Sequence, residues 1–167
     1  YETAIETALG GSIQNIVTDN EQTAKRMIEF LKKNKFGRAT FLPLTQIHSH
    51  GGIAQPQALK EAGVIGLADT LVMVEDKYLE LAGSLLGRTL VVDHIDHGLA
   101  IARKYRQSIR IVTLEGDLIN PGGSMTGGAF KNSSNLLSRR REIEELEQAV
   151  QRLRADVAKT EQEIAEL

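Results

Sequence analysis

Four glycines fall within seven residues in the segment Asn120-Pro121-Gly122-Gly123-Ser124-Met125-Thr126-Gly127-Gly128. Glycine permits positive φ and lets two backbones approach closely. Because the segment follows a predicted strand, we expect an interface here at which the backbones of two subunits meet closely; the alternative is a flexible loop that joins the domain to the coil. The expected dimer-interface residues are Gly122, Gly123, Ser124, Met125, Gly127 and Gly128.

The same glycines do not form a phosphate-binding loop. Gly122 and Gly127 have the GxxxxG spacing, but Gly128-Ala129 stands where that motif requires Lys-Ser/Thr. Without this lysine and hydroxyl, the loop offers no charge to the β- and γ-phosphates and no ligand to Mg²⁺. Lys131 comes three residues too late.

The chain before this segment repeats one order of elements. The apolar patterns predict a helix over residues 1–9, a strand over 13–17, a helix over 21–33 and a strand over 38–42. The order recurs as a helix over 78–86, a strand over 89–92, a helix through 105 and a strand over 108–114. Tyr1 and Tyr78, which open the two units, are 77 positions apart. We interpret this as an internal repeat.

The second unit has a lead-in that the first lacks. Residues 63–74 are mostly apolar and predict a turn followed by a buried strand, or by a helix and a strand. Nothing comparable precedes Tyr1, so we expect the first half to lack its opening element. The predicted domains are a first subdomain over 1–45, a linker over 46–62, a second subdomain over 63–130, and a neck with a coiled-coil helix over 131–167.

Acidic residues at two predicted helix starts suggest caps. Asp19 with Gln22 three residues later resembles a capping box, and Asp93 with Asp96 opens the corresponding helix of the second unit.

The four histidines allow a zinc site to be considered, because zinc accepts histidine and carboxylate ligands. His48 and His50 form an HxH pair, and His94 and His97 lie among the capping aspartates. The first unit has the same cap without a histidine, so capping is the simpler explanation. The chain has no cysteine. We therefore predict no metal, no cofactor and, because no nucleophile–base motif is present, no catalytic residue.

The last part of the chain has the spacing of a coiled coil. Apolar residues alternate at intervals of three and four over more than three heptads, with Thr160 as the polar interruption. The predicted seam consists of Ile143, Leu146, Val150, Leu153, Val157, Ile164 and Leu167. One helix cannot bury this seam alone, so a partner helix is expected.

A formal net charge of −2 excludes a chain-wide basic field, so any contact with nucleic acid must be local. Two basic groups could hold DNA phosphates without sequence specificity. Either group could equally be a solvent-exposed helix face. In particular, the negative charges of Glu142, Glu144 and Glu145 offset the positive charge of Arg139-Arg140-Arg141. The candidate DNA contacts are Lys131, Arg139, Arg140, Arg141, Lys32 and Lys33.

Several runs together resemble the hinge domain of bacterial SMC (structural maintenance of chromosomes) proteins. The first half resembles the family in residues 4–11, 14–17 and 37–44, and the second half in residues 110–117 and in the glycine segment 120–128. Family members often carry a lysine cluster after this segment, whereas here only Lys131 and Arg139-Arg140-Arg141 follow.

The resemblance implies an α+β fold of two similar helix/strand subdomains followed by a long coiled-coil helix. It also implies a homodimer that pairs the first half of one copy with the second half of the other, antiparallel arms, and ATPase heads outside this chain. The expected role is chromosome condensation and segregation at the nucleoid in the cytoplasm. The expected partners are a second hinge copy, the missing N-terminal hinge segment with its arm, and non-specific DNA, but no membrane.

One alternative stays open. A small α/β ligand-binding or enzymatic domain with a coiled-coil oligomerisation tail could place a cleft between the halves, with Glu115, Asp117 and Asn120 at a loop after a strand.

Overall fold

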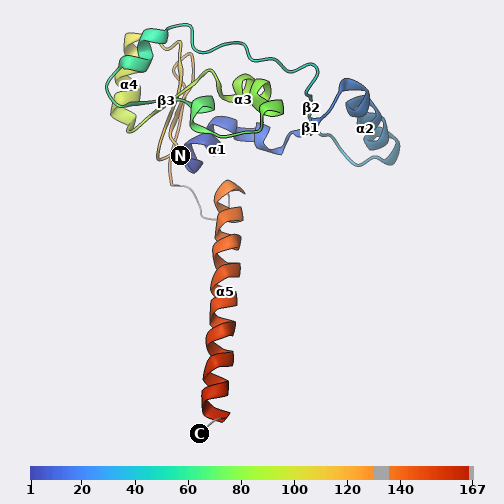
Figure 1. Cartoon of the computed structure of the whole chain (residues 1–167). Helices are drawn as coiled ribbons and strands as arrows, with labels where there is room; N and C mark the ends of the chain where they lie inside the picture. Colours follow the sequence, from blue (N-terminus) through green and yellow to red (C-terminus); the bar gives the residue numbers. More distant parts are fainter. Residues whose placement is uncertain (130–135, 166–167) are drawn as a thin grey trace. The chain divides into compact units, whose positions relative to one another are not determined.

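Two sheets of unequal size form within residues 1–129, and helix α5 (Leu136–Ala165) is a separate unit (Figure 1). The computed structural model describes residues 1–129 and 136–165. Two predicted site residues, Lys131 and Leu167, lie outside the described residues.

The smaller sheet pairs two parallel strands, β1 (Ile16–Thr18) and β2 (Phe41–Pro43), joined by helix α2 (Glu21–Asn34). The side chain of Asn20 caps α2 by accepting a hydrogen bond from the Thr23 amide at 2.9 Å. The predicted Asp19–Gln22 capping box is therefore wrong by one residue. The Asp19 carboxylate accepts instead from the Asn20 amide.

The larger sheet has the strand order β3-β4-β5-β6-β7. Its central pair, β4 (Thr89–Val92) and β5 (Arg110–Thr113), is parallel and corresponds to the β1–β2 pair. The other neighbours are antiparallel: β3 (Val64–Leu67), β6 (Leu118–Ile119) and β7 (Met125–Thr126). The predicted repeat is confirmed in the element order α1-β1-α2-β2 and α3-β4-α4-β5.

Side chains alternate between the two faces of the larger sheet, as they must along a strand. Helix α4 (Ile95–Lys104) covers one face, where Gly98 leaves room for the side chains of Ile111 and Ile119. The core on this face consists of Ala58, Leu90, Val92, Ile101, Ala102, Ile109, Ile111 and Ile119.

The opposite face of the larger sheet is covered by helices from both repeat units. Helix α3 (Leu79–Leu86) contributes Leu86, and helix α1 (Glu2–Leu9) contributes Ala4, Ile5 and Ala8. Arg110 on β5 fixes the end of α1, because its Nη1 donates to the Ala8 carbonyl at 2.9 Å. By sequence α1 belongs to the first unit, yet it packs against Val91 and Val112 of the second.

The smaller sheet keeps much of its apolar surface exposed. Ile16 and Val17 on β1 are 39% and 40% exposed, and Phe30 and Phe36 are 56% and 66% exposed. No residue between Ile16 and Ile47 belongs to either core cluster of the described residues.

Some element boundaries differ from those predicted. The strand expected over 13–17 begins only at Ile16, because Gly10–Gln14 forms a 3₁₀ helix, η1. The second strand lies later than predicted, over Phe41–Pro43. Short 3₁₀ helices occupy Pro56–Lys60 (η2), Ala68–Leu71 (η3) and Asp76–Tyr78 (η4). Within the described ranges, no helix is both long and apolar enough to cross a membrane.

Candidate dimerisation edge

The glycine segment forms the turn of a β-hairpin between β6 and β7. Leu118 is paired with Thr126 and Ile119 with Met125. The turn is closed by a bond from the Asn120 amide to the Ser124 carbonyl at 2.9 Å and by one from the Gly123 amide to the Asn120 carbonyl at 3.0 Å.

The conformation and packing of the chain itself explain why glycine occupies each of these four positions. Gly122, Gly123 and Gly128 have φ values of 87°, 94° and 131°, which other residues rarely adopt. Gly127 has no such φ, but a Cβ there would collide with the Asp117 carboxylate. Local geometry therefore explains these glycines, so the feature that favours an interface is the strand that follows the turn.

That strand, β7, ends the five-stranded order, so among the described residues its outer edge has no partner strand. Met125 on β7 is 52% exposed. An unpaired edge presents a row of N–H and C=O groups that can pair with a strand of another chain. The structure places Gly122, Gly123 and Ser124 in the turn that leads into this edge.

The turn is hydrogen-bonded to the segment that follows the end of helix α4. The Gly122 amide donates to the Gln107 carbonyl at 2.8 Å. Arg106 and Gln107 have φ values of 54° and 56°, so two consecutive non-glycine residues are left-handed. This support could not be predicted from the sequence, because neither Arg106 nor Gln107 carries a local signal for the left-handed conformation.

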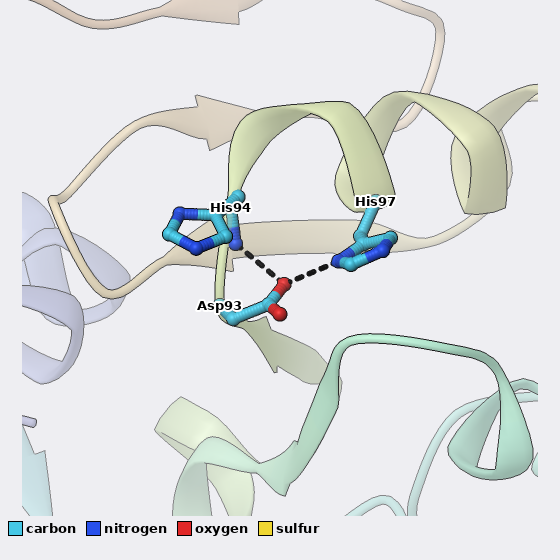
Figure 2. A network of polar contacts seen from close by, with 3 residues as sticks. All are labelled: Asp93, His94 and His97. Atoms are coloured by element: carbon cyan, nitrogen blue, oxygen red, sulfur yellow. Dashed lines mark hydrogen bonds and ion pairs between the residues drawn. The ribbon is translucent and has the colours of Figure 1, made fainter.

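The start of α4 holds the polar network drawn in Figure 2. Asp93 Oδ1 lies 2.6 Å from His97 Nδ1 and accepts a hydrogen bond from the His94 amide at 2.6 Å. The bond with His97 is the main reason that the pKa of Asp93 lies below its ordinary value. The N-cap residue is His94, without a side-chain cap bond, so the prediction that Asp93 and Asp96 cap this helix is wrong.

This network joins Gly63, the residue that follows the predicted linker, to the start of α4. The Asp93 amide donates to the Gly63 carbonyl at 2.9 Å, and a Cβ on Gly63 would collide with the His97 ring. In the part of the chain that the structure describes, no three histidine, aspartate or glutamate side chains converge as a metal site would require.

A second contact between linker and α4 was also missed from sequence. Glu61 Oε1 accepts from Lys104 Nζ at 2.6 Å and from the Tyr105 hydroxyl at 2.7 Å. The hydrogen bond from Lys104 is the main cause that lowers the pKa of Glu61. The hydrogen bonds from Asp93 to Gly63, and from Lys104 and Tyr105 to Glu61, hold the end of the linker against α4.

The acidic loop considered for a cleft is a structural turn. The Asp117 amide donates to Thr113 Oγ1 at 2.9 Å, and this hydroxyl donates to Asp117 Oδ2 at 3.2 Å. Asp117 thus closes the turn between β5 and β6.

The candidate DNA contacts are divided between the two units of the chain. Lys32 and Lys33 are in the last turn of α2, where cations are favoured by the helix dipole. In α5, Arg140 pairs with Glu144 and Arg141 with Glu145. Both pairs are solvent-exposed, which leaves the arginines able to exchange a carboxylate for a phosphate.

The predicted coiled-coil seam lies along α5. Its described members are about half exposed or more, from 47% at Val150 to 66% at Ile164. The described residues therefore bury none of this seam well, which is the state expected of a coiled-coil helix without its partner.

The chain matches the family model of the SMC proteins' flexible hinge domain over residues 1–102. Chromosome partition protein Smc of Bacillus subtilis is 43% identical over 170 residues, and that of Desulfitobacterium hafniense is 45% identical over 168. Both alignments include 100% of this chain but only 14% of the relative, so the chain spans about one seventh of these proteins.

Solved structures show the same fold. An asymmetric dimer of the Geobacillus stearothermophilus SMC hinge domain superposes with a TM-score of 0.77 at 40% identity, covering 97% of this chain and 66% of that one. The Pyrococcus furiosus Smc hinge domain with an extended coiled coil gives a TM-score of 0.62 at 30% identity, covering 92% and 53%.

Proposed function

Because this chain belongs to the family of SMC flexible hinge domains, we propose that it joins two subunits of a chromosome-partitioning SMC protein. The observation that carries this proposal is the outer edge of β7, which no other strand of the described residues pairs with and which follows a turn of fixed geometry. A related hinge domain crystallised as an asymmetric dimer, which supports the same role for this chain. We propose further that the chain is not itself an enzyme and acts at the nucleoid, with ATPase heads elsewhere in the full-length protein.

In the proposed dimer, the edge of β7 in one copy meets the first half of the other copy. The smaller sheet suits this role, since within residues 1–129 and 136–165 its strands β1 and β2 pair with each other and with no further strand. Its exposed apolar residues, such as Ile16 and Val17, would lose contact with water on association. The subdomain boundaries at 1–45 and 63–130 are part of this proposal.

The test places a charge on the edge without touching a glycine. Glycine substitutions would strain the turn itself, whereas Met125 lies in an ordinary strand and is half-exposed. Met125→Glu and Ser124→Glu should weaken dimerisation at least about tenfold, which corresponds to about 1.4 kcal/mol. Sedimentation equilibrium over a dilution series measures this.

Met73→Glu is the matched control, because Met73 is fully exposed and lies far from the edge in sequence. It should leave the dimer unchanged. Dimers of Met125→Glu and Ser124→Glu as tight as the parent would show that β7 is not the interface. A parent chain that stays monomeric at high concentration would favour the alternative of a ligand-binding domain with a coiled-coil tail.

Non-specific DNA contact is a second part of the proposed function. It is supported by the exposed basic groups at the end of α2 and the start of α5, which include Lys32, Lys33, Arg139, Arg140 and Arg141. No base-reading motif accompanies them, so binding would depend on phosphates alone.

A further inference from the structure

The end of helix α4 has a backbone conformation that requires an explanation. The left-handed region is unfavourable for a non-glycine residue, because its Cβ comes too close to the following carbonyl oxygen. Arg106 and Gln107 both adopt it, one after the other, two residues before the buried Ile109. Strained residues of this kind persist only where their surroundings fix them, and they gather at functional positions.

Three contacts fix Gln107. Its amide donates to the Ala102 carbonyl at 2.8 Å, which closes the end of α4. Its carbonyl accepts from the Gly122 amide at 2.8 Å. Its side chain lies against the turn, since a Cβ on Gly123 would be 3.8 Å from Gln107 Cγ. The left-handed bend thus directs both the carbonyl and the side chain of one residue at the two glycines that precede β7.

We infer that Gln107 is the positioning residue of the dimerisation edge. It holds the glycine turn in the position in which the outer edge of β7 can pair with a second copy. Among the described residues, the other hydrogen bonds of the turn lie within the hairpin, between Asn120 and Gly123 or Ser124. Without the bond to Gln107, the hairpin could tilt about the short strand β6 while the core stays intact. This inference rests on the proposed function of the β7 edge.

The experiment varies how well position 107 tolerates a left-handed backbone. Gln107→Asn and Gln107→Gly keep the bend, because asparagine and glycine adopt this region readily. Gln107→Val disfavours it, because a β-branched residue is a clear outlier there. Gln107→Ala is a milder version, in case the valine variant does not fold.

We expect the asparagine and glycine variants to dimerise within about threefold of the parent chain, and the valine variant at least about tenfold more weakly. A second readout separates positioning from general stability. Amide hydrogen exchange at Gly122 should accelerate in Gln107→Val and Gln107→Ala, while exchange in β4 and β5 stays as in the parent. Leu90→Val, a core change on β4, is the stability control and should leave both the dimer and Gly122 unchanged.

The outcomes separate the positioning role of Gln107 from the proposed dimerisation through β7. If Met125→Glu weakens the dimer but Gln107→Val does not, the edge is the interface and Gln107 does not position it. If neither variant weakens the dimer, the proposed interface itself is wrong. Rapid exchange of the Gly122 amide in the parent chain would also overturn the role of Gln107.

Discussion

Asp93 and His97 face each other across one turn at the start of α4, with Oδ1 and Nδ1 2.6 Å apart. The contact favours the ionised carboxylate, so the pKa of Asp93 in the folded chain lies below its ordinary value. A carboxyl group with a lowered folded pKa contributes stability above its unfolded pKa, about 3.9, and that contribution is lost as the pH falls through the folded value.

We therefore expect Asp93→Asn to be less stable than the parent at neutral pH and to approach it as the pH falls below about 4. Urea denaturation between acidic and neutral pH measures the difference. In the control variant Asp76→Asn, which changes an exposed carboxylate of η4, the free energy of unfolding should depend on pH as it does in the parent. A constant gap between Asp93→Asn and the parent at every pH would contradict the proposed ionic contribution.

Arg110→Ala should destabilise the chain by about 1.5–3 kcal/mol, the range for hydrogen bonds to charged groups. The guanidinium is partly buried, and burial lowers its pKa. It is bonded to the last turn of α1, where a cation is favoured by the helix dipole. Urea denaturation gives the free energy of unfolding, with the exposed Arg103→Ala as control. Equal losses in both variants would mean that the bond to Ala8 is not what holds α1.

DNA affinity, if it comes from the two basic groups, should fall steeply with salt. Each phosphate contact removed by Lys32→Glu or Lys33→Glu should lower the slope of log K against log salt by roughly 0.9. The same holds for charge reversal at Arg139, Arg140 and Arg141. Fluorescence anisotropy with two unrelated duplexes measures affinity and slope, with Lys77→Glu as control. Sequence preference, or binding that survives high salt, would rule out this account.

The seam of α5 should make its helix depend on a partner. Replacing Leu146 and Leu153 with serine should abolish any rise in helicity with concentration, because both residues lie on the apolar seam. Gln148→Ser with Ala155→Ser, on the opposite face, should retain it. Circular dichroism at two concentrations tests the difference. Equal behaviour of the two double variants would mean that the seam does not associate.

Local signals in the sequence predicted the parallel strands β4 and β5 of the larger sheet. Strand β4 was predicted with the bounds that it has, Thr89–Val92, because its apolar run sits between a glycine and an aspartate. The N-cap of α2 was misplaced because Asp19 and Asn20 are both good capping residues, and only the backbone decides between them. The strands of the glycine hairpin have two residues each, which is too short for a periodic pattern.

The candidate site was predicted less completely than the fold. The glycine segment was identified, but its support at Gln107 depends on a tertiary contact with no counterpart in local sequence. The same holds for Glu61, whose partners Lys104 and Tyr105 are more than 40 residues away. The packing of α1 on the second unit was also not predicted, since the repeat pattern assigns α1 to the first.

The position of α1 has a consequence for the order of folding. Ala8 and Arg110 are separated by 102 residues, so α1 can complete its contacts with β4 and β5 only once those strands have been synthesised. During synthesis from the N-terminus, α1 is made before β4 and β5, so its apolar face stays exposed until the larger sheet is available to cover it. Until then Ala4, Ile5 and Ala8 are open to other chains, and a helix from one nascent copy could dock on the sheet of another. Intertwined subunits would be the misfolded product that this topology favours.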